Sequence, residues 1–215
     1  MNRPQTDRPP QTAAPQRLLS LDTLRGFDMF FIMGFAALVV SLCRLWPGGF
    51  SDWLIAQMGH AEWDGFFHHD TIFPLFLFIA GISFPFSLAK QRSKGTSERA
   101  ILAKIVRRGL TLVLLGLVYN GLFRLDFATL RLPSVLGRIG LAWMFAALLY
   151  MRFGLRTRIV LAAGILAAYS LVLHFVGAPD APGAGTLTLE GNIAGYIDRR
   201  IMPSHLYLDG FDLCE

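Results

Sequence analysis

The sequence predicts an all-α protein that crosses a membrane with about five helices, and two observations carry this prediction. The first is the composition: 53% of the 215 residues are hydrophobic, only 16% are charged, and the mean hydropathy is +0.47. This balance is typical of polytopic membrane proteins and excludes most soluble domains. The second is the grouping of apolar residues into long runs with few or no charges, because a helix needs roughly 20 residues to cross about 30 Å of hydrocarbon.

The expected elements follow from these runs and the polar segments around them. Residues 1–16 are polar and Pro-rich, so we expect a disordered cytoplasmic tail there, ahead of a transmembrane domain over 17–177. Residues 178–215 are expected to form an outer loop that contains a short amphipathic helix over 191–201 and leads toward a sixth helix that the chain does not reach. The spanning helices are expected at about 26–46, 70–90, 105–124, 132–151 and 158–177.

The distribution of Lys and Arg predicts the orientation of these helices. Fourteen of these residues fall before the first helix and in the connections between helices two and three and between helices four and five. Five fall in the other connections and at the far end, and Arg138 lies within a helix. Because Lys and Arg concentrate on the cytoplasmic side, the N-terminus is expected in the cytoplasm. The net charge of +5 is explained by this topology and needs no nucleic-acid partner.

A polar cluster from His60 to Asp70 directly precedes the uncharged stretch 71–89. Ionisable side chains are costly near hydrocarbon, so their concentration there indicates a site. His60 is the first candidate, because imidazole titrates near neutrality and can take a proton from an attacking amine or hydroxyl. If this segment is helical, Trp63 would share a face with His60 and offer an apolar or sugar-stacking wall. The alternative is that His60 is an ordinary loop histidine at the level of the lipid headgroups.

Two further histidines and an aspartate stand beside this candidate. His68, His69 and Asp70 could join His60 in binding a metal ion, but their spacing matches no established ligand pattern, so no metal is expected. Adjacent His68 and His69 would point in different directions from any helix.

Charged residues also enter the expected helices. Asp22, Arg25 and Asp28 are spaced by three, which predicts an ion pair of Arg25 with a neighbouring carboxylate. Asp28 reaches the apolar stretch and needs a partner from another helix, for which Arg138 is one candidate. Asn120 likewise needs a hydrogen-bond partner within the membrane, and its default interpretation is a structural role.

Three arginines could bind an anionic ligand. Arg107 and Arg108 lie at the cytoplasmic end of the third expected helix, and Arg138 lies inside the fourth. A guanidinium group keeps its charge and binds phosphate or carboxylate with two parallel hydrogen bonds. The alternative is that Arg107 and Arg108 only set the topology and that Arg138 forms a structural ion pair.

The two cysteines, Cys43 and Cys214, both fall on the outer side in the expected topology. A disulfide between them stays open, but two unpaired thiols are the favoured interpretation, because two residues alone do not indicate a pairing. Formation of a homo-oligomer also stays open.

Several motifs in the same order resemble the family of heparan-alpha-glucosaminide N-acetyltransferase and its bacterial relatives. They extend from about Arg17 to Tyr207 and include the segment 17–30, His60-x2-Trp63-x-Gly65-Phe66, Asp70-x-Ile72-Phe73-Pro74, Arg107-Arg108, Tyr119-Asn120-Gly121, segment 131–139 and segment 192–199. The family's Pro-Gly-Val-Leu-Gln-Arg reads Pro133-Ser134-Val135-Leu136-Gly137-Arg138 here. An Asn that some of these transferases carry shortly before the active histidine is absent.

The resemblance implies an acetyl-CoA-dependent membrane N-acetyltransferase in a bacterial inner membrane. Acetyl-CoA would arrive from the cytoplasm, and the acceptor would be the amine of a glucosamine-type sugar on the outer side. His60 matches the family's active-site histidine, as a base or as a carrier of the acetyl group. In that interpretation Arg107, Arg108 and Arg138 are expected to bind the donor, and Asp28, Trp63, Asp70 and Asn120 to contact the substrate or support the site.

Two other functions stay open. In a transporter or sugar-export subunit, Asp28, Asn120 and Arg138 would line a path and His60 would act as a gate or proton relay. Because family members continue for several more helices, the chain is also expected to be the N-terminal part of a longer enzyme, or an inactive fragment of one.

Overall fold

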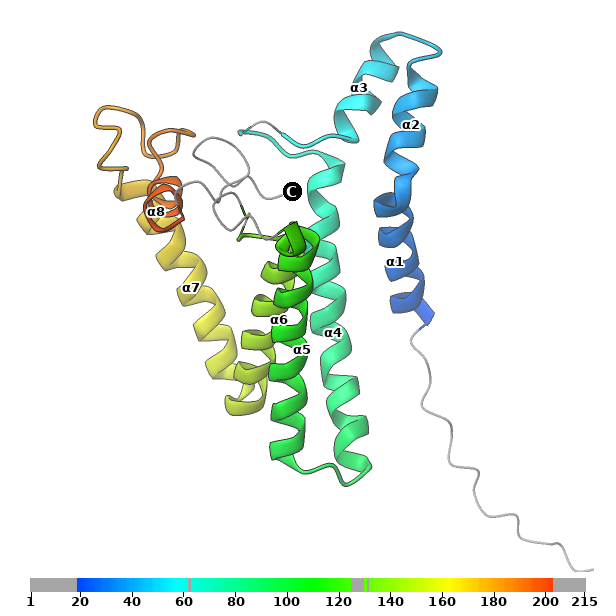
Figure 1. Cartoon of the computed structure of the whole chain (residues 1–215), viewed down its shortest axis with the longest axis vertical. Helices are drawn as coiled ribbons and strands as arrows, with labels where there is room; N and C mark the ends of the chain where they lie inside the picture. The colour runs from blue at the N-terminus through cyan, green and yellow to red at the C-terminus, as the bar shows by residue number, and fades with distance from the viewer. Residues whose placement is uncertain (1–18, 62, 125–129, 131, 203–215) are drawn as a thin grey trace, which may run out of the picture.

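The computed structural model describes residues 19–61, 63–124, 130 and 132–202, which form helices joined by loops (Figure 1). The all-α prediction is confirmed, because extended structure in these ranges is limited to one isolated bridge between Gly177 and Asn192. The tail predicted over 1–16 and the candidate disulfide partner Cys214 lie outside the described residues. In chain order the elements are α1 (Leu19–Phe30), η1 (Phe31–Phe35), α2 (Ala36–Cys43), α3 (Gly49–Gln57), η2 (His68–Thr71), α4 (Ile72–Ser93), α5 (Glu98–Tyr119), η3 (Leu122–Arg124), α6 (Val135–Arg152), α7 (Leu155–Phe175) and α8 (Ile193–Ile201).

Within the described residues, four helical segments are long and apolar enough to cross a membrane. They are Leu19–Cys43, His68–Ser93, Val135–Arg152 and Leu155–Phe175. The prediction of a polytopic helical bundle is confirmed, with one fewer such segment than the five expected. The difference is α5, which has 22 residues but carries Lys104, Arg107 and Arg108 in its first half. These three charges interrupt the apolar run that a spanning helix requires.

The first spanning segment begins before residue 26 and contains an irregular turn. α1 starts at Leu19, so Asp22 and Arg25 lie inside the helix, where their side chains are 3.2 Å apart in the expected ion pair. The π-helical turn η1 joins α1 to α2, and its Gly34 has a φ of 121°, which residues with a Cβ rarely adopt. The short helix α3 that follows is not anticipated by the sequence pattern.

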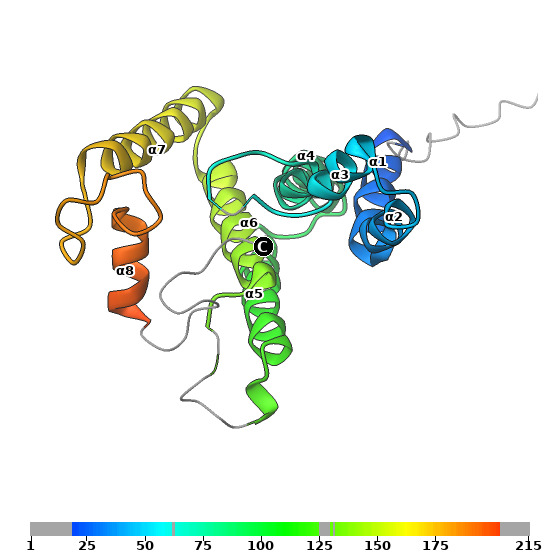
Figure 2. The same ribbon diagram turned by 90° about the horizontal axis from the view of Figure 1, so that it is seen from above.

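The helices α4, α5 and α6 form the centre of the molecule. Figure 2 shows α1 and α2 on one side of them and α7 and α8 on the other. The core lies in the half of these helices nearest the connection from α4 to α5 and consists of Phe84, Leu88, Ile101, Ile105, Met144 and Ala147. At that connection Arg92 Nε donates to Glu98 over 2.7 Å, and this hydrogen bond lowers the pKa of the Glu98 carboxyl.

Glycines allow α5 and α6 to pack closely. A Cβ at Gly109 would lie 2.8 Å from the Cβ of Met144, and a Cβ at Gly140 would lie 2.7 Å from the Cβ of Leu112 and 2.8 Å from the Gly109 carbonyl oxygen. All three distances are shorter than the contacts that real Cβ atoms make, so neither Gly109 nor Gly140 has room for a side chain. Small residues at a helix interface let the two backbones approach each other, which is a common way to pack helices in lipid.

The start of α6 is fixed by polar side chains. Ser134 caps the helix, with its Oγ accepting the N–H of Gly137 at 2.9 Å. A Cβ at Gly137 would lie 2.9 Å from that same oxygen, so serine at 134 and glycine at 137 fit each other as a pair. These are the two positions at which the chain departs from the family's motif. Asn120 Nδ2 donates to the Pro133 carbonyl at 3.0 Å, so Asn120 joins the end of α5 to this cap.

The helix predicted over 191–201 is present as α8. Asn192 caps it by accepting the N–H of Gly195 at 2.6 Å, and its Nδ2 donates to the Leu189 carbonyl at 2.8 Å. The loop between α7 and α8 is therefore tied to the start of α8. α7 itself has no buried residue, and most of its apolar side chains are exposed.

The two ends of the bundle differ in charge. The connections from α4 to α5 and from α6 to α7 lie together at one end, which we call the basic end because Lys90, Arg92 and Arg156 are found there (Figure 1). The elements α3, η2 and α8 lie at the opposite end. His60 falls between α3 and η2 in the chain, so we call this the His60 end.

The topology can be tested with fused reporters. We expect a periplasmic reporter joined after Arg99, at the basic end, to be inactive and one joined after Asp180, in the α7–α8 loop, to be active, because the 14-to-five distribution of Lys and Arg keeps the basic end in the cytoplasm. The reverse pattern would place His60 in the cytoplasm and overturn the expected orientation.

The close packing of α5 and α6 predicts a position-specific effect of alanine. Gly140→Ala is expected to lower the stability of the purified chain in detergent by about 1–3 kcal/mol, because the added Cβ meets Leu112 and the Gly109 backbone. Gly164→Ala on α7 is the matched control: it has nothing within 4 Å, so only the higher helix propensity of alanine acts. Equal thermal unfolding temperatures for the two variants would contradict the packing described for α5 and α6.

Candidate functional site

His60 and Asp70 form a hydrogen-bonded pair at the His60 end. His60 Nδ1 lies 2.7 Å from Asp70 Oδ1, and Asp70 Oδ2 accepts the backbone N–H of Phe67 at 2.9 Å. Both carboxylate oxygens are therefore held in place. An ionised carboxylate can only accept hydrogen bonds, so the neutral His60 ring carries its proton on Nδ1 and leaves Nε2 free to accept one. The side chains remain partly open, with 37% of His60 and 24% of Asp70 exposed.

The two neighbouring histidines have different surroundings, as their adjacency predicts. The His69 ring lies against that of His60, with 4.7 Å between centroids and an angle of 76°. The His68 ring instead packs on Phe31, with 4.7 Å between centroids, and its backbone N–H donates to Gln57 Oε1 at 3.1 Å. From the sequence, His69 is considered only as a possible metal ligand and not as a residue of this site. Its place beside Asp70 was the available signal.

Trp63 does not share a helix face with His60, so that prediction is wrong. The described residues from 60 to 67 are not helical. A spacing of three residues therefore does not place the side chains of His60 and Trp63 on the same side of the segment. Trp63 Nε1 donates to the Leu187 carbonyl at 2.9 Å, which joins the loop after His60 to the loop between α7 and α8. Trp63 thus holds two loops of the His60 end together and is not among the residues lining the cavity described next.

A cavity of about 770 Å³ opens beside the pair, and we call it the His60 cavity. Its polar wall is formed by His60, His69 and Asp70. The rest is almost entirely apolar and comes from α1 with η1, α4 and α6: Met29, Ile32, Ile72, Phe73, Pro74, Phe76, Val135, Leu136 and Ile139. A concave apolar site with a few converging polar groups is the usual form of a small-molecule site.

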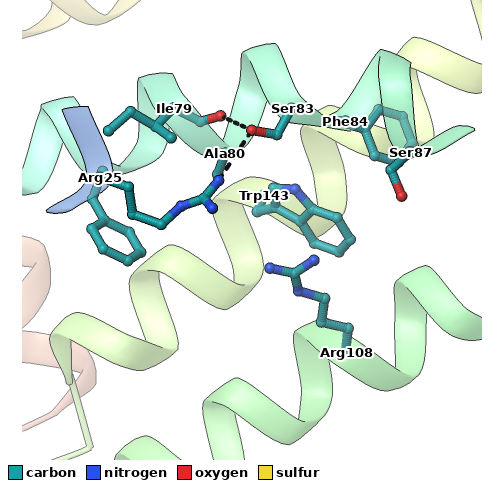
Figure 3. A pocket seen from close by; sticks show the side chains of 9 residues that line it. Arg25, Ile79, Ala80, Ser83, Phe84, Ser87, Arg108 and Trp143 are labelled. Atoms are coloured by element: carbon teal, nitrogen blue, oxygen red, sulfur yellow. Dashed lines mark hydrogen bonds between the residues drawn. The ribbon is translucent and has the colours of Figure 1, made fainter. Parts of the chain in front are cut away.

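A second cavity, of about 470 Å³, lies nearer the basic end, and we call it the arginine cavity (Figure 3). Arg25 from α1 and Arg108 from α5 both extend toward Trp143 of α6. The Arg108 guanidinium carbon lies 4.4 Å from the centre of the Trp143 ring, and Arg25 Nη2 donates weakly to Ser83 Oγ at 3.4 Å. Ser87 also lines this cavity. Two guanidinium groups and the hydroxyl of Ser87 suit an anion such as phosphate.

The two cavities meet at α4. Phe76 lines both of them, while Ser83 and Ser87 line only the arginine cavity and Phe73 lines only the His60 cavity. From Phe73 to Ser87 is about 21 Å along a helix axis. The two cavities together therefore follow α4 through most of the hydrocarbon thickness, with Phe76 at their boundary.

The three arginines expected to bind the donor are not brought together. Arg108 lines the arginine cavity, and the adjacent Arg107 does not. Arg138 lies on the first turn of α6, between Leu136 and Ile139, which both line the His60 cavity. Arg25 is the arginine that the sequence analysis assigned only to an ion pair with Asp22. The structure places it beside Ser83, facing the same space as Arg108.

Asp28 is buried where α1 packs against α4, with 1% of its surface exposed. Neither of its carboxylate oxygens has a hydrogen-bond partner in the described part of the chain. The pairing with Arg138 that the sequence suggested is therefore not formed. The physical reason is that α1 and α6 face each other across the His60 cavity, which both of them line.

Metal-binding groups can be judged only for the residues that the structure describes, which omit Glu62. Among them, no set of three or more His, Cys, Asp or Glu side chains is arranged to hold a metal ion. The pair of His60 and Asp70 is instead arranged for proton transfer, because the carboxylate orients one ring nitrogen and leaves the other free.

Comparison with known proteins supports the resemblance seen in the motifs. The human protein named heparan-alpha-glucosaminide N-acetyltransferase is 32% identical to the chain over 146 residues, which are 66% of the chain. The chain is therefore similar to this acetyltransferase over part of its length. The mouse protein of the same name is 31% identical over 149 residues, again 66% of the chain. No protein-family model matches the chain.

The relationship to the acetyltransferases covers only part of their length. The matched segments make up 20% of the human protein and 21% of the mouse protein, so the chain spans about a fifth of these relatives. Together with four apolar spanning segments, the relationship supports an integral membrane protein. The activity, the substrates and the roles of individual residues are matters for proposal.

Proposed function

We propose that the chain acts in a membrane acetyltransferase, moving an acetyl group from acetyl-CoA at the basic end to the amine of a glucosamine-type sugar at the His60 end. The observation that carries this proposal is the His60–Asp70 pair at the edge of a cavity that adjoins a second, arginine-lined cavity. The relationship to the N-acetyltransferases supports the type of reaction. The membrane is then the bacterial inner membrane, with the basic end in the cytoplasm.

His60 is the proposed general base. With Nδ1–H donated to Asp70, Nε2 accepts a proton from the acceptor amine as the amine nitrogen bonds to the acetyl carbon. The carbon–sulfur bond of the thioester breaks, and the proton is available to the departing thiolate. Asp70 holds the ring in the correct tautomer and stabilises the imidazolium form between these two transfers. His69, whose ring lies on His60, forms a wall of the acceptor site.

The arginine cavity is the proposed site for the phosphates of acetyl-CoA. Acetyl-CoA supplies a thioester that is already activated, so the protein contributes mainly positioning and proton transfer. Arg25 and Arg108 approach from two helices, and Ser87 adds a hydroxyl donor to the lining, whereas the Ser83 hydroxyl donates to the Ile79 carbonyl. Of the three arginines selected from the sequence, only Arg108 lines this cavity, so the proposal keeps Arg108 and adds Arg25.

Replacement of His60 tests the proposed base. His60→Ala is expected to lower the rate of thiol release from acetyl-CoA with glucosamine about 100- to 10,000-fold, because a positioned base typically contributes this much. Asp70→Asn is expected to lower it less, by favouring the wrong tautomer. His68→Ala is the matched control and should have a small effect, since its ring packs on Phe31 outside the cavity. Full turnover in His60→Ala would refute the assignment, and sugar flux without acetylation would indicate transport.

Neutralising single arginines tests the donor site. Arg25→Gln and Arg108→Gln are each expected to raise the dissociation constant for CoA by about 10- to 100-fold, because a hydrogen bond to a charged group is worth roughly 1.5–3 kcal/mol. Arg107→Gln is the matched control, adjacent in sequence but outside the cavity lining. The measurement is binding to the chain in detergent or nanodiscs. A larger loss for Arg107→Gln than for Arg108→Gln would place the donor elsewhere.

A further inference from the structure

The buried carboxyl group of Asp28 has no role in the chemistry assigned to His60 or in the phosphate site. It is 1% exposed, and both of its oxygens lack a hydrogen-bond partner within the described residues. Most buried polar side-chain atoms in folded proteins have at least one such partner. Leaving a buried acceptor unsatisfied lowers the stability of the folded state, so Asp28 as it stands costs stability.

The position of Asp28 along α1 suggests what would satisfy it. Arg25, three residues earlier, lines the arginine cavity, whereas Met29 and Ile32, one and four residues later, line the His60 cavity. Asp28 itself lines neither cavity, but its place between these residues puts it at the level where one cavity ends and the other begins. Phe76 of α4 marks the same boundary, because it lines both cavities.

The proposed function requires a chain-like ligand to cross this boundary. The phosphates of acetyl-CoA would sit by Arg25 and Arg108, while its acetyl group must reach His60. The arm between these two parts is largely apolar but carries two amide N–H groups and a hydroxyl. Such donors would lose hydrogen bonds to water in an apolar passage and need acceptors from the protein. In the described residues at this level, Asp28 is a buried acceptor without a partner.

Resting on the proposed function, we propose that Asp28 binds the amide-bearing pantetheine arm of the acyl donor at the boundary between the two cavities. Its carboxyl oxygens accept N–H or O–H groups of the arm, and Phe76 is the side chain that moves to join the cavities. η1 (Phe31–Phe35) begins one turn of helix after Asp28, and its irregular backbone at Gly34 separates α1 from the regular turns of α2. α1 and α2 therefore do not form one rigid helix, and α1 can shift against α4 while α2 stays in place.

The test compares CoA with adenosine 3′,5′-bisphosphate, which has the nucleoside and two of the three phosphates of CoA but lacks the arm. For Asp28→Leu, which removes the acceptor, we expect CoA to bind about 10- to 100-fold more weakly and the bisphosphate to bind as it does to the unaltered chain. Asp28→Asn, which keeps one acceptor oxygen, is expected to give a smaller loss. Asp52→Asn is the matched control, an exposed aspartate on α3 outside both cavities.

Thermal unfolding of the same variants separates binding from a structural role. Asp28→Leu is expected to unfold at the same or a higher temperature than the unaltered chain, because it removes an unsatisfied buried group. Asp28→Asn is expected to unfold at about the same temperature, because it exchanges one unsatisfied polar group for another. A loss of stability in both variants would make Asp28 structural and overturn the inference.

The binding outcomes also separate this inference from the proposed function. Unchanged CoA binding in Asp28→Leu, or equal losses for CoA and the bisphosphate, would overturn the role of Asp28 while leaving the donor site in place. Failure of the unaltered chain to bind either ligand would overturn the donor site itself, and the inference with it.

Discussion

The position of α4 between α1 and α6 is the constraint on which the candidate site depends. α4 contacts both helices, and it carries the shared cavity wall at Phe76 and the hydroxyls of Ser83 and Ser87. η2, which leads into α4, carries Asp70. α6 is held beside α4 by its close packing on α5 through glycines. Because lipid offers no hydrogen-bond partners, the polar groups that line these cavities must be satisfied by each other, by water or by a ligand.

The bundle separates two kinds of chemistry along this axis. At the His60 end, a carboxylate holds an imidazole in one tautomer beside an apolar cavity. Toward the basic end, the Arg108 guanidinium lies over the Trp143 ring and Arg25 lines the same cavity. One end can therefore accept a proton and the other can bind an anion, while the buried carboxyl of Asp28 lies between them. This order matches a donor and an acceptor that approach from opposite faces of a membrane.

Much of the fold could be predicted from the sequence, because apolar runs and the positions of Lys and Arg act locally. The ion pair of Arg25 with Asp22 and the helix α8 are examples. The site was less predictable, because it depends on how distant segments meet. The spacing of Trp63 from His60 implied a shared face only if the segment were helical, and it is not. Likewise, charge alone paired Asp28 with Arg138, whereas a cavity lies between their helices.

The most direct test of this account is a sided assay in sealed vesicles that contain the chain in one orientation. Acetyl-CoA, which does not cross lipid, is supplied only at the basic end, and glucosamine only at the His60 end. The account predicts N-acetylglucosamine in the compartment of the acceptor, with free CoA thiol appearing in the compartment of the donor. Product that forms only when both substrates are on the same side would contradict transfer along α4.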